Sequence, residues 1–376
     1  MELEHYQKIA LYGFLGATLF GAIANRTNFC TMGAISDWIN MGSLTRLRVW
    51  FLAMGIAMIG AQALHIGGAI DLGESIYLTT NFTWVGYIVG GLLFGIGMTI
   101  GSGCGQKTLV RVGGGNLKSL VLVLVMAITA YMTLRGLLAL LRLQINDPTT
   151  IDLTERGLAT QGMPEILSNL TGLGASTASI IVVALVGGSA ILFALRDSQV
   201  WKSFDNLLAG IGIGLIIAGA WYVTGVLGFD DFDPIPLEGR SFISPVGNTL
   251  SYLMTYTGSV INFGIAVVLG MIFGSFLYSI ATGGFRIESF NDKSDLVNHL
   301  VGGVLMGFGG VMSLGCTIGQ GITGMSTLAL GSVMALVSII FGCVLTLKMQ
   351  YYLYDEKGWG HAFRSTLSDI FSRSQA

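Results

Sequence analysis

Two stretches of the chain decide its fold: residues 90–104 read GGLLFGIGMTIGSGC, and residues 302–316 read GGVLMGFGGVMSLGC. Aligned without a gap, they share four glycines and the Gly-Cys pair that ends each stretch. Glycines at this spacing are typical of membrane helices that pack closely. Helix packing alone accounts for the glycines, but it does not explain a cysteine repeated at the same place. The pattern therefore indicates an internal repeat.

The composition of the chain is that of a protein embedded in lipid. Of its 376 residues, 52% are hydrophobic and only 11% are charged, and its mean hydropathy is +0.72. Soluble domains carry about 25% charged residues. The net charge of −2 gives no basic surface for nucleic acid. Glu2 and Glu4 stand where a secretory signal would carry positive charge, so we expect the first hydrophobic segment to stay in the mature protein.

Nine segments are apolar enough to cross a bilayer, which takes roughly 20 residues of helix. They predict an all-α integral membrane protein with a single membrane domain over residues 1–376. The predicted spans are residues 9–24, 49–70, 83–100, 117–141, 175–195, 207–227, 260–281, 297–314 and 330–352. Polar, glycine-rich stretches between them predict short re-entrant helices, whose free backbone groups need protein or water around them. These stretches are residues 25–39, 101–116, 283–291 and 315–326.

Charged residues in the loops predict the orientation, because Lys and Arg gather on the cytoplasmic side. They favour an N-terminus outside the bacterial inner membrane and a C-terminus in the cytoplasm. The basic residues are Arg46, Arg48, Arg196, Lys202, Lys357, Arg364 and Arg373, and the acidic loop after the sixth span contains Asp230, Asp231, Asp233 and Glu238. With this topology the third and eighth spans run in opposite directions. The repeat halves, about residues 9–141 and 207–352, are then inverted, as in many transporters.

Three of the four cysteines lie in polar clusters that end or interrupt apolar segments. Cys30 lies in NRTNFCTMG, Cys104 in GSGCGQK and Cys316 in GCTIGQG. A helix that begins beside such a cysteine would bind an anion through its dipole and free N–H groups, and it would favour the thiolate. The alternative is that each cysteine is a small buried hydrophobe. That alternative is our expectation for Cys343, which lies within an apolar run.

Several positive charges near these clusters could guide an anion. Lys107 and Arg111 follow Cys104 at helical spacing, Arg26 precedes Cys30, and Arg286 precedes the second repeat. Gln320, beside Cys316, could add an amide. The alternative is that the cations are interfacial anchors, which positive-inside residues often are.

Two further titratable residues lie in or beside apolar runs. Arg135 lies inside a predicted span and needs a partner or a route to water. His65 could relay protons, but at a span end we interpret it as an interfacial residue.

The absence of other motifs narrows the function. The chain has no phosphate-binding glycine–lysine–serine loop, which excludes an ATPase of that type. No histidine pair has metal-ligand spacing, no CxxC occurs, and no Ser/His/Asp cluster can be argued from so few polar residues. We therefore expect neither a metal nor a cofactor, and we expect a transporter rather than an enzyme.

At the three cysteine motifs the sequence resembles the YeeE/YedE family of bacterial inner-membrane proteins, which import thiosulfate or related sulfur compounds. The resemblance rests on Arg26-x-x-Phe29-Cys30-x-x-Gly33 with Asp37, on the glycine run ending at Gly103-Cys104, and on residues 302–321. It implies an hourglass-shaped fold of nine spans plus short helices entering from both faces. It also implies that Cys30, Cys104 and Cys316 relay thiosulfate by transient thiol hydrogen bonds. Where the family often has Gly-Cys-Ala-x-Gly, this chain has Cys104-Gly105-Gln106-Lys107. This departure places an amide and a charge beside Cys104 and leaves the substrate open.

Two other functions compete with transport of a sulfur anion. A membrane thiol oxidoreductase would explain free cysteines in a helical bundle, although paired cysteines are missing. A membrane partner that docks a soluble sulfur-carrier or sulfurtransferase protein on the cytoplasmic side is compatible with transport. The sequence does not distinguish thiosulfate from other reduced sulfur species or from a selenium analogue.

Overall fold

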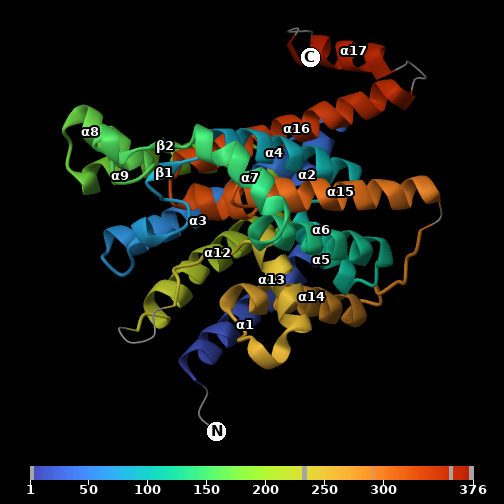
Figure 1. Ribbon diagram of the computed structural model, residues 1–376, viewed down its shortest axis with the longest axis horizontal. Helices are drawn as coiled ribbons and strands as arrows, with labels where there is room; N and C mark the ends of the chain where they lie inside the picture. The colour runs from blue at the N-terminus through green and yellow to red at the C-terminus, as the bar shows by residue number, and fades with distance from the viewer. Residues whose placement is uncertain (1–3, 231–234, 291, 355–358, 372–376) are drawn as a thin grey trace.

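The computed structural model describes residues 4–230, 235–290, 292–354 and 359–371, and nearly all of its regular structure is helical (Figure 1). One short antiparallel pair joins β1 (Asn81–Phe82) to β2 (Ile151–Asp152). Asp231, Asp233, Lys357 and Arg373, whose charges contributed to the predicted orientation, lie outside the described residues.

Nine helical segments within these ranges are long and apolar enough to span a membrane, which confirms the predicted all-α membrane fold. Two of them combine a long and a short helix: α1 (His5–Arg26) with α2 (Thr31–Met41), and α4 (Trp84–Ile100) with α5 (Gly105–Gly113). The sixth, Phe204–Leu227, combines α11 (Phe204–Leu207), η4 (Leu208–Gly212), α12 (Ile213–Tyr222) and η5 (Val223–Leu227). The others are α3 (Thr45–Ile66), α6 (Leu117–Arg135), α9 (Ala175–Leu195), α14 (Phe263–Ala281), α15 (Lys293–Met312) and α16 (Leu330–Tyr354).

Shorter helices connect the spans or enter between them. The α-helices are α7 (Leu138–Asn146), α8 (Met163–Thr171), α10 (Ser198–Lys202), α13 (Ile243–Met254) and α17 (Trp359–Phe371). The 3₁₀ turns are η1 (Leu72–Glu74), η2 (Asp147–Thr149), η3 (Thr154–Arg156) and η6 (Tyr256–Gly258), and η7 (Gly319–Gly324) is a π-helical turn. In Figure 1, α8 and the start of α9 project from one side of the bundle, and α17 lies beyond the end of α16.

The fourth span ends earlier than predicted. Residues 117–141 were expected to form one helix, but α6 stops at Arg135 because Gly136 adopts an extended conformation, and α7 starts as a separate helix. Arg135 is therefore an exposed residue of the last turn and reaches solvent at the helix end. The apolar run of residues 117–141 hides this break, and only the single glycine marks it.

Short helices occur in three of the four predicted re-entrant stretches, as α2, α5 and η7. The prediction for residues 283–291 is wrong over the described part, 283–290, which contains no helix. Its backbone pairs with the segment between α5 and α6: Arg286 N–H donates to Gly114 O, and Leu117 N–H donates to Glu288 O. These bonds satisfy the backbone without a helix. The short helix α13 lies in a region that was predicted to be a loop.

The repeated glycines bring α4 and α15 into direct backbone contact. A Cβ at Gly97 would lie 2.9 Å from Gly302 O, and a Cβ at Gly309 would lie 2.6 Å from Gly90 O. The sequence numbers rise along one helix as they fall along the other, so the two helices are antiparallel. Gly90 and Gly302 are 212 positions apart, as are Gly97 and Gly309, so each contact maps onto the other. This is the self-complementary pattern that an inverted repeat predicts, while the division into two halves stays a prediction.

A second close pair is formed by α1 and α14, which run parallel. Gly270 and Gly274 of α14 face the backbone oxygens of Phe14 and Thr18, and Gly21 of α1 faces Met271. The side-chain amide of Asn25 extends this contact by donating to Ser275 and Ser279. Side chains larger than glycine would separate these helices, because the facing atoms belong to backbone.

One end of the bundle gathers most of the cations, and we call it the basic face. It is the end at which α1, α4 and α14 finish and α3, α6 and α15 begin. Links between these elements fix it: Lys107 donates to Asn28, and Lys118 pairs with Asp295. The opposite face contains the ends of α3 and α12. There His65, at the last turn of α3, lies 3.7 Å from Asp71 Oδ1 and 3.2 Å from Ile70 O.

Gly274→Ala is expected to destabilise the bundle, because the new Cβ would overlap Thr18 O. The loss should be about 1–3 kcal/mol, the usual range for overpacking. The measurement is thermal stability in detergent, followed by size-exclusion chromatography of heated samples. Gly219→Ala in α12 is the matched control, because a Cβ there meets no atom within 4 Å. Equal stability losses in the two variants would contradict the packing assignment.

Candidate functional site

The three predicted cysteines share one backbone arrangement. Two residues before each of them, a residue other than glycine adopts a left-handed conformation: Asn28 at φ 52°, Ser102 at φ 58° and Leu314 at φ 59°. In each case a long helix has just ended and the cysteine starts a new helical segment, α2, α5 or the turns that lead into η7. Left-handed residues of this kind are costly and concentrate at functional sites.

Side chains satisfy the carbonyl groups that these breaks leave free. Arg46 Nη2 donates to Asn28 O at 2.8 Å, and Arg111 Nη1 donates to Ser102 O at 2.7 Å. At the third break Gln320 Nε2 donates to Ser313 O at 2.5 Å, and its Oε1 accepts from Ser332. Because lipid offers no hydrogen bonds, a broken helix at membrane depth needs such partners.

All four cysteines are free thiols and buried. Cys30 Sγ lies 3.8 Å from Cys104 Sγ, close enough for an S–H···S contact. Cys30 Sγ also accepts from Gly33 N–H at 3.4 Å, and Cys316 Sγ accepts from Gly319 N–H at 3.3 Å. Backbone donors thus point at two of the three sulfurs. Cys343 instead accepts from Thr99 Oγ1 at 3.2 Å, between α16 and α4.

Two cavities lie at the basic face, and the smaller one is lined by a cysteine. It measures about 20 Å³, enough for about one water, and is lined by Asn28, Cys30, Arg46 and Trp50 among others. A larger one of about 530 Å³ shares Asn28 with it. Its lining includes the cations Lys107, Arg111, Lys118 and Arg286, together with Glu288, Asp295 and His299.

A cavity of about 90 Å³ lies on the other side of the cysteines and has a different chemistry. Tyr77, Glu238, Ser241 and Leu314 line it, together with residues of α13 and α14. A Cβ at Gly319 would lie 2.8 Å from Ser241 Oγ and 3.6 Å from Tyr77 Oη. The hydroxyl groups of Ser241 and Tyr77 therefore lie beside Gly319, which follows Cys316 by three residues in the chain. Burial raises the pKa of Tyr77, with Cys316 and Glu238 adding to the effect, so its hydroxyl stays a donor.

The structure brings together some of the predicted guiding residues and separates others. Lys107, Arg111 and Arg286 line the same cavity on the basic face. Arg26 instead forms an exposed ion pair with Asp205 at 2.8 Å, and its guanidinium lies over the Phe204 ring. Both ends of the Gln320 side chain are occupied by protein groups.

Sequence reasoning missed Trp50, Tyr77 and Ser241 and counted Arg46 only as a loop charge. Trp50 and Tyr77 carry no motif that would have marked them. A signal did exist for Ser241: the 212-residue offset takes Cys30 to position 242 and Thr31 to Ile243, where α13 begins. Extending the repeat to the first cysteine would have predicted a short helix there, next to the cavity that Ser241 lines.

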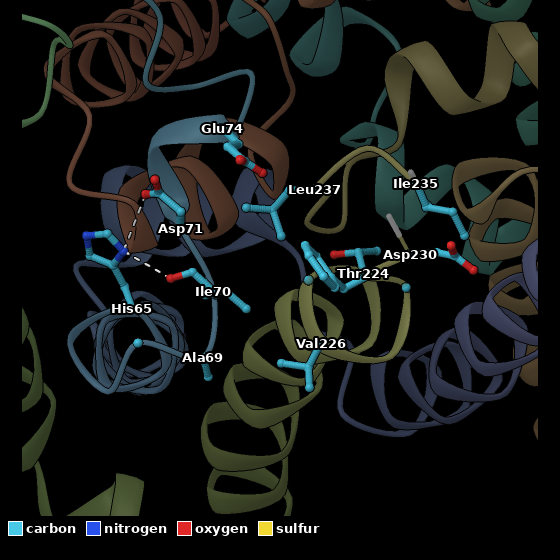
Figure 2. A pocket seen from close by; sticks show the side chains of 14 residues that line it. His65, Ala69, Ile70, Asp71, Glu74, Thr224, Val226, Asp230, Ile235 and Leu237 are labelled. Atoms are coloured by element: carbon cyan, nitrogen blue, oxygen red, sulfur yellow. Dashed lines mark hydrogen bonds and ion pairs between the residues drawn. The ribbon is translucent and has the colours of Figure 1, made fainter. Parts of the chain in front are cut away.

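A larger cavity lies elsewhere, at the opposite face between the end of α3 and η5 (Figure 2). It measures about 840 Å³ and is lined by His65, Asp71, Glu74, Asp230 and apolar side chains. Figure 2 shows Asp71 and Ile70 beside the His65 ring. Three carboxylates disfavour an anion here. Over the described residues no group of three or more His, Cys, Asp or Glu side chains could hold a metal.

A family model described as "Sulphur transport" matches residues 26–345 of the chain. The protein belongs to this family. The match covers all three cysteine motifs and both glycine runs, and it confirms the resemblance to the YeeE/YedE proteins.

Two relatives of this sulphur-transport protein have curated names. The thiosulfate transporter TsuA of Escherichia coli strain K12 is 28% identical over 353 residues, which cover 88% of this chain and 92% of that protein. The thiosulfate transporter TsuA of Spirochaeta thermophila is 25% identical over 337 residues, 88% of this chain and 96% of that protein. The likeness therefore extends over nearly the whole length of both relatives.

A small methanethiosulfonate reagent is expected to modify Cys30 before the other cysteines in the folded protein. Cys30 is 7% exposed and lines a cavity at the basic face, whereas Cys104, Cys316 and Cys343 are each 0% exposed. Peptide mass spectrometry of the detergent-purified protein gives the order of labelling. All four should react after unfolding in dodecyl sulfate. Labelling of Cys316 ahead of Cys30 would contradict this geometry.

Proposed function

We propose that the protein carries thiosulfate across the bacterial inner membrane through the constriction formed by Cys30, Cys104 and Cys316. The observation that supports the proposal most directly is the contact of two buried thiols, Cys30 and Cys104, beside a small cavity of the basic face. A third buried thiol, Cys316, precedes Gly319, which lies against Ser241 of a second cavity. The names of both curated relatives supply the anion. The proposal assigns no catalytic step and no cofactor to the chain.

The chemistry of the thiols suits this anion. A thiol is a weak hydrogen-bond donor with a soft sulfur. The terminal sulfur of thiosulfate is large, polarisable and weakly hydrated, so thiols can replace part of its hydration shell. Sulfate presents only oxygens and would lose more on leaving water. Cys30 and Cys104, with sulfurs 3.8 Å apart, could pass the terminal sulfur between them without a covalent bond.

The cations near the proposed path lie at one of its two ends. Lys107, Arg111 and Arg286 line the basic-face cavity, where they would stabilise an anion leaving the constriction. We place this face in the cytoplasm, with the N-terminus outside and the C-terminus inside. The inverted halves, about residues 9–141 and 207–352, would then meet at the constriction, giving an hourglass with a cavity at each end.

The two competing functions remain separate hypotheses. Cys30 and Cys104 are the pair that a thiol oxidoreductase would use, and mass mapping that finds no disulfide between them under any redox condition would remove it. A soluble sulfur-carrier or sulfurtransferase protein would receive its cargo at the basic face. A pull-down from detergent with such carriers tests that partnership.

Cys104→Ala and Cys316→Ala are each expected to lower thiosulfate uptake at least tenfold, because each removes a thiol from the constriction. Uptake is measured in cells that lack other thiosulfate routes. Cys343→Ala is the matched control, because this equally buried thiol contacts Thr99 between two helices, and it should keep near wild-type uptake. Unchanged uptake in both the Cys104→Ala and Cys316→Ala variants would contradict the proposed cysteine relay.

Purified protein in liposomes is expected to give thiosulfate flux well above sulfate flux. The physical reason is the loss of hydration by the hard oxygens of sulfate in a constriction of weak thiol donors. The measurement is uptake of radiolabelled thiosulfate and sulfate at equal concentration, with empty liposomes as the blank. Equal rates for the two anions would rule out discrimination by the cysteines.

A further inference from the structure

Four buried side chains around the cysteines each have a polar atom without a hydrogen-bond partner within the described part of the chain. They are Thr31, Trp50, Gln106 and Thr317, and each is at most 1% exposed. A buried polar group without a partner costs free energy, because it has lost water and gained nothing. Native proteins keep few such groups, and each calls for an explanation.

Their positions follow the cysteines. Thr31 directly follows Cys30, Thr317 directly follows Cys316, and Gln106 is two residues after Cys104. Unpaired buried atoms also occur away from the cysteines, Gln62 Oε1 and Thr366 Oγ1 among them, while Gln161 and Trp221 are bonded. Trp50 and Gln106 differ from Gln62 and Thr366 because each has an unpaired N–H donor and lies beside a cysteine.

The Gln106 side chain lies directly beside a thiol. Its Oε1 is 3.9 Å from Cys104 Sγ, and its Nε2 is the end without a partner. The two ends belong to one planar amide. Whichever end is nitrogen, one faces the sulfur and the other stays unpaired.

Trp50 reaches the same region from α3. Its indole packs against Gly321 of η7, where a Cβ would lie 2.7 Å from the ring, and it lines the small cavity with Cys30 and Arg46. It thus contacts the elements of both Cys30 and Cys316. The indole N–H is a donor only, so an acceptor must come from outside the described protein groups.

We propose that Trp50 and Gln106 bind the oxygen atoms of the anion while the cysteine thiols face its terminal sulfur. The inference rests on the proposed function, since it assigns further specificity residues to the same anion. A thiosulfate ion offers three oxygen acceptors and one soft sulfur, and the constriction supplies strong N–H donors beside weak S–H donors. The N–H groups gain their bonds only when the ion arrives, so they contribute to binding and not to folding.

The test replaces each donor with a side chain of similar size that cannot donate. Gln106→Met and Trp50→Phe are each expected to raise the KM for thiosulfate uptake roughly tenfold, the usual effect of one lost hydrogen bond to a charged group. Without thiosulfate, Gln106→Met loses only the long contact with Cys104 and should stay near wild-type stability, whereas Trp50→Phe should lose some stability because the ring packs against Gly321. With thiosulfate, the ligand-induced rise in stability should shrink.

Matched controls separate this role from a structural one. Gln161→Met and Trp221→Phe remove donors that have protein partners, so they should lower stability and leave the KM for thiosulfate unchanged. Wild-type KM in both Gln106→Met and Trp50→Phe, or a thiosulfate-induced rise in stability as large as that of wild type in both, would overturn the inference.

The same data distinguish this inference from the transport proposal. Absence of thiosulfate flux in wild type contradicts transport. If thiosulfate still stabilises that wild type and the effect is lost in Gln106→Met and Trp50→Phe, the donor assignment holds.

Discussion

A helix that stops inside a bilayer leaves backbone carbonyls that lipid cannot satisfy, and this constraint shapes the whole molecule. At each of the three breaks a side chain satisfies a free carbonyl group: Arg46 at Asn28, Arg111 at Ser102 and Gln320 at Ser313. Each break places a cysteine at the start of a new helical segment, and at two of them a backbone N–H of that segment donates to the sulfur. The side chains that satisfy the breaks therefore help to hold the cysteines in place.

Close packing is what keeps these breaks away from lipid. The glycines of α4 and α15 let two antiparallel helices meet backbone to backbone, and those of α1 and α14 do the same for a parallel pair. The short helix α5 and the turn η7 are mostly buried, whereas α2 keeps exposed residues such as Met41. In both repeated stretches the glycines bring α4 and α15 together, and the cysteine that follows each glycine run is buried.

The constriction separates two kinds of hydrogen bonding. Carbonyl groups at the breaks are satisfied by the protein, whereas donors next to the cysteines are not. Under the proposed function, these unpaired donors are the groups that would bind the anion. The two neighbouring cavities also differ in their lining, because one contains the hydroxyl groups and the other contains the cations.

By itself the sequence determined the membrane fold, the approximate positions of nine spans within the described ranges and the repeated glycine pattern of α4 and α15, because hydropathy and glycine spacing are local features. The role of the three cysteines stays a prediction. The sequence misplaced the end of α6 and a helix at residues 283–290, since an apolar run conceals Gly136 and since the pairing of 283–290 with 114–117 is long-range. The sequence predicted that Arg111 and Gln320 guide an anion. In the structure both side chains donate to backbone carbonyl groups at the breaks. Only the tertiary structure decided that Trp50 from α3 lies against Gly321 and that Cys30 meets Cys104 across 74 positions. Contacts of this kind depend on how helices pack, and no local pattern in the chain encodes them.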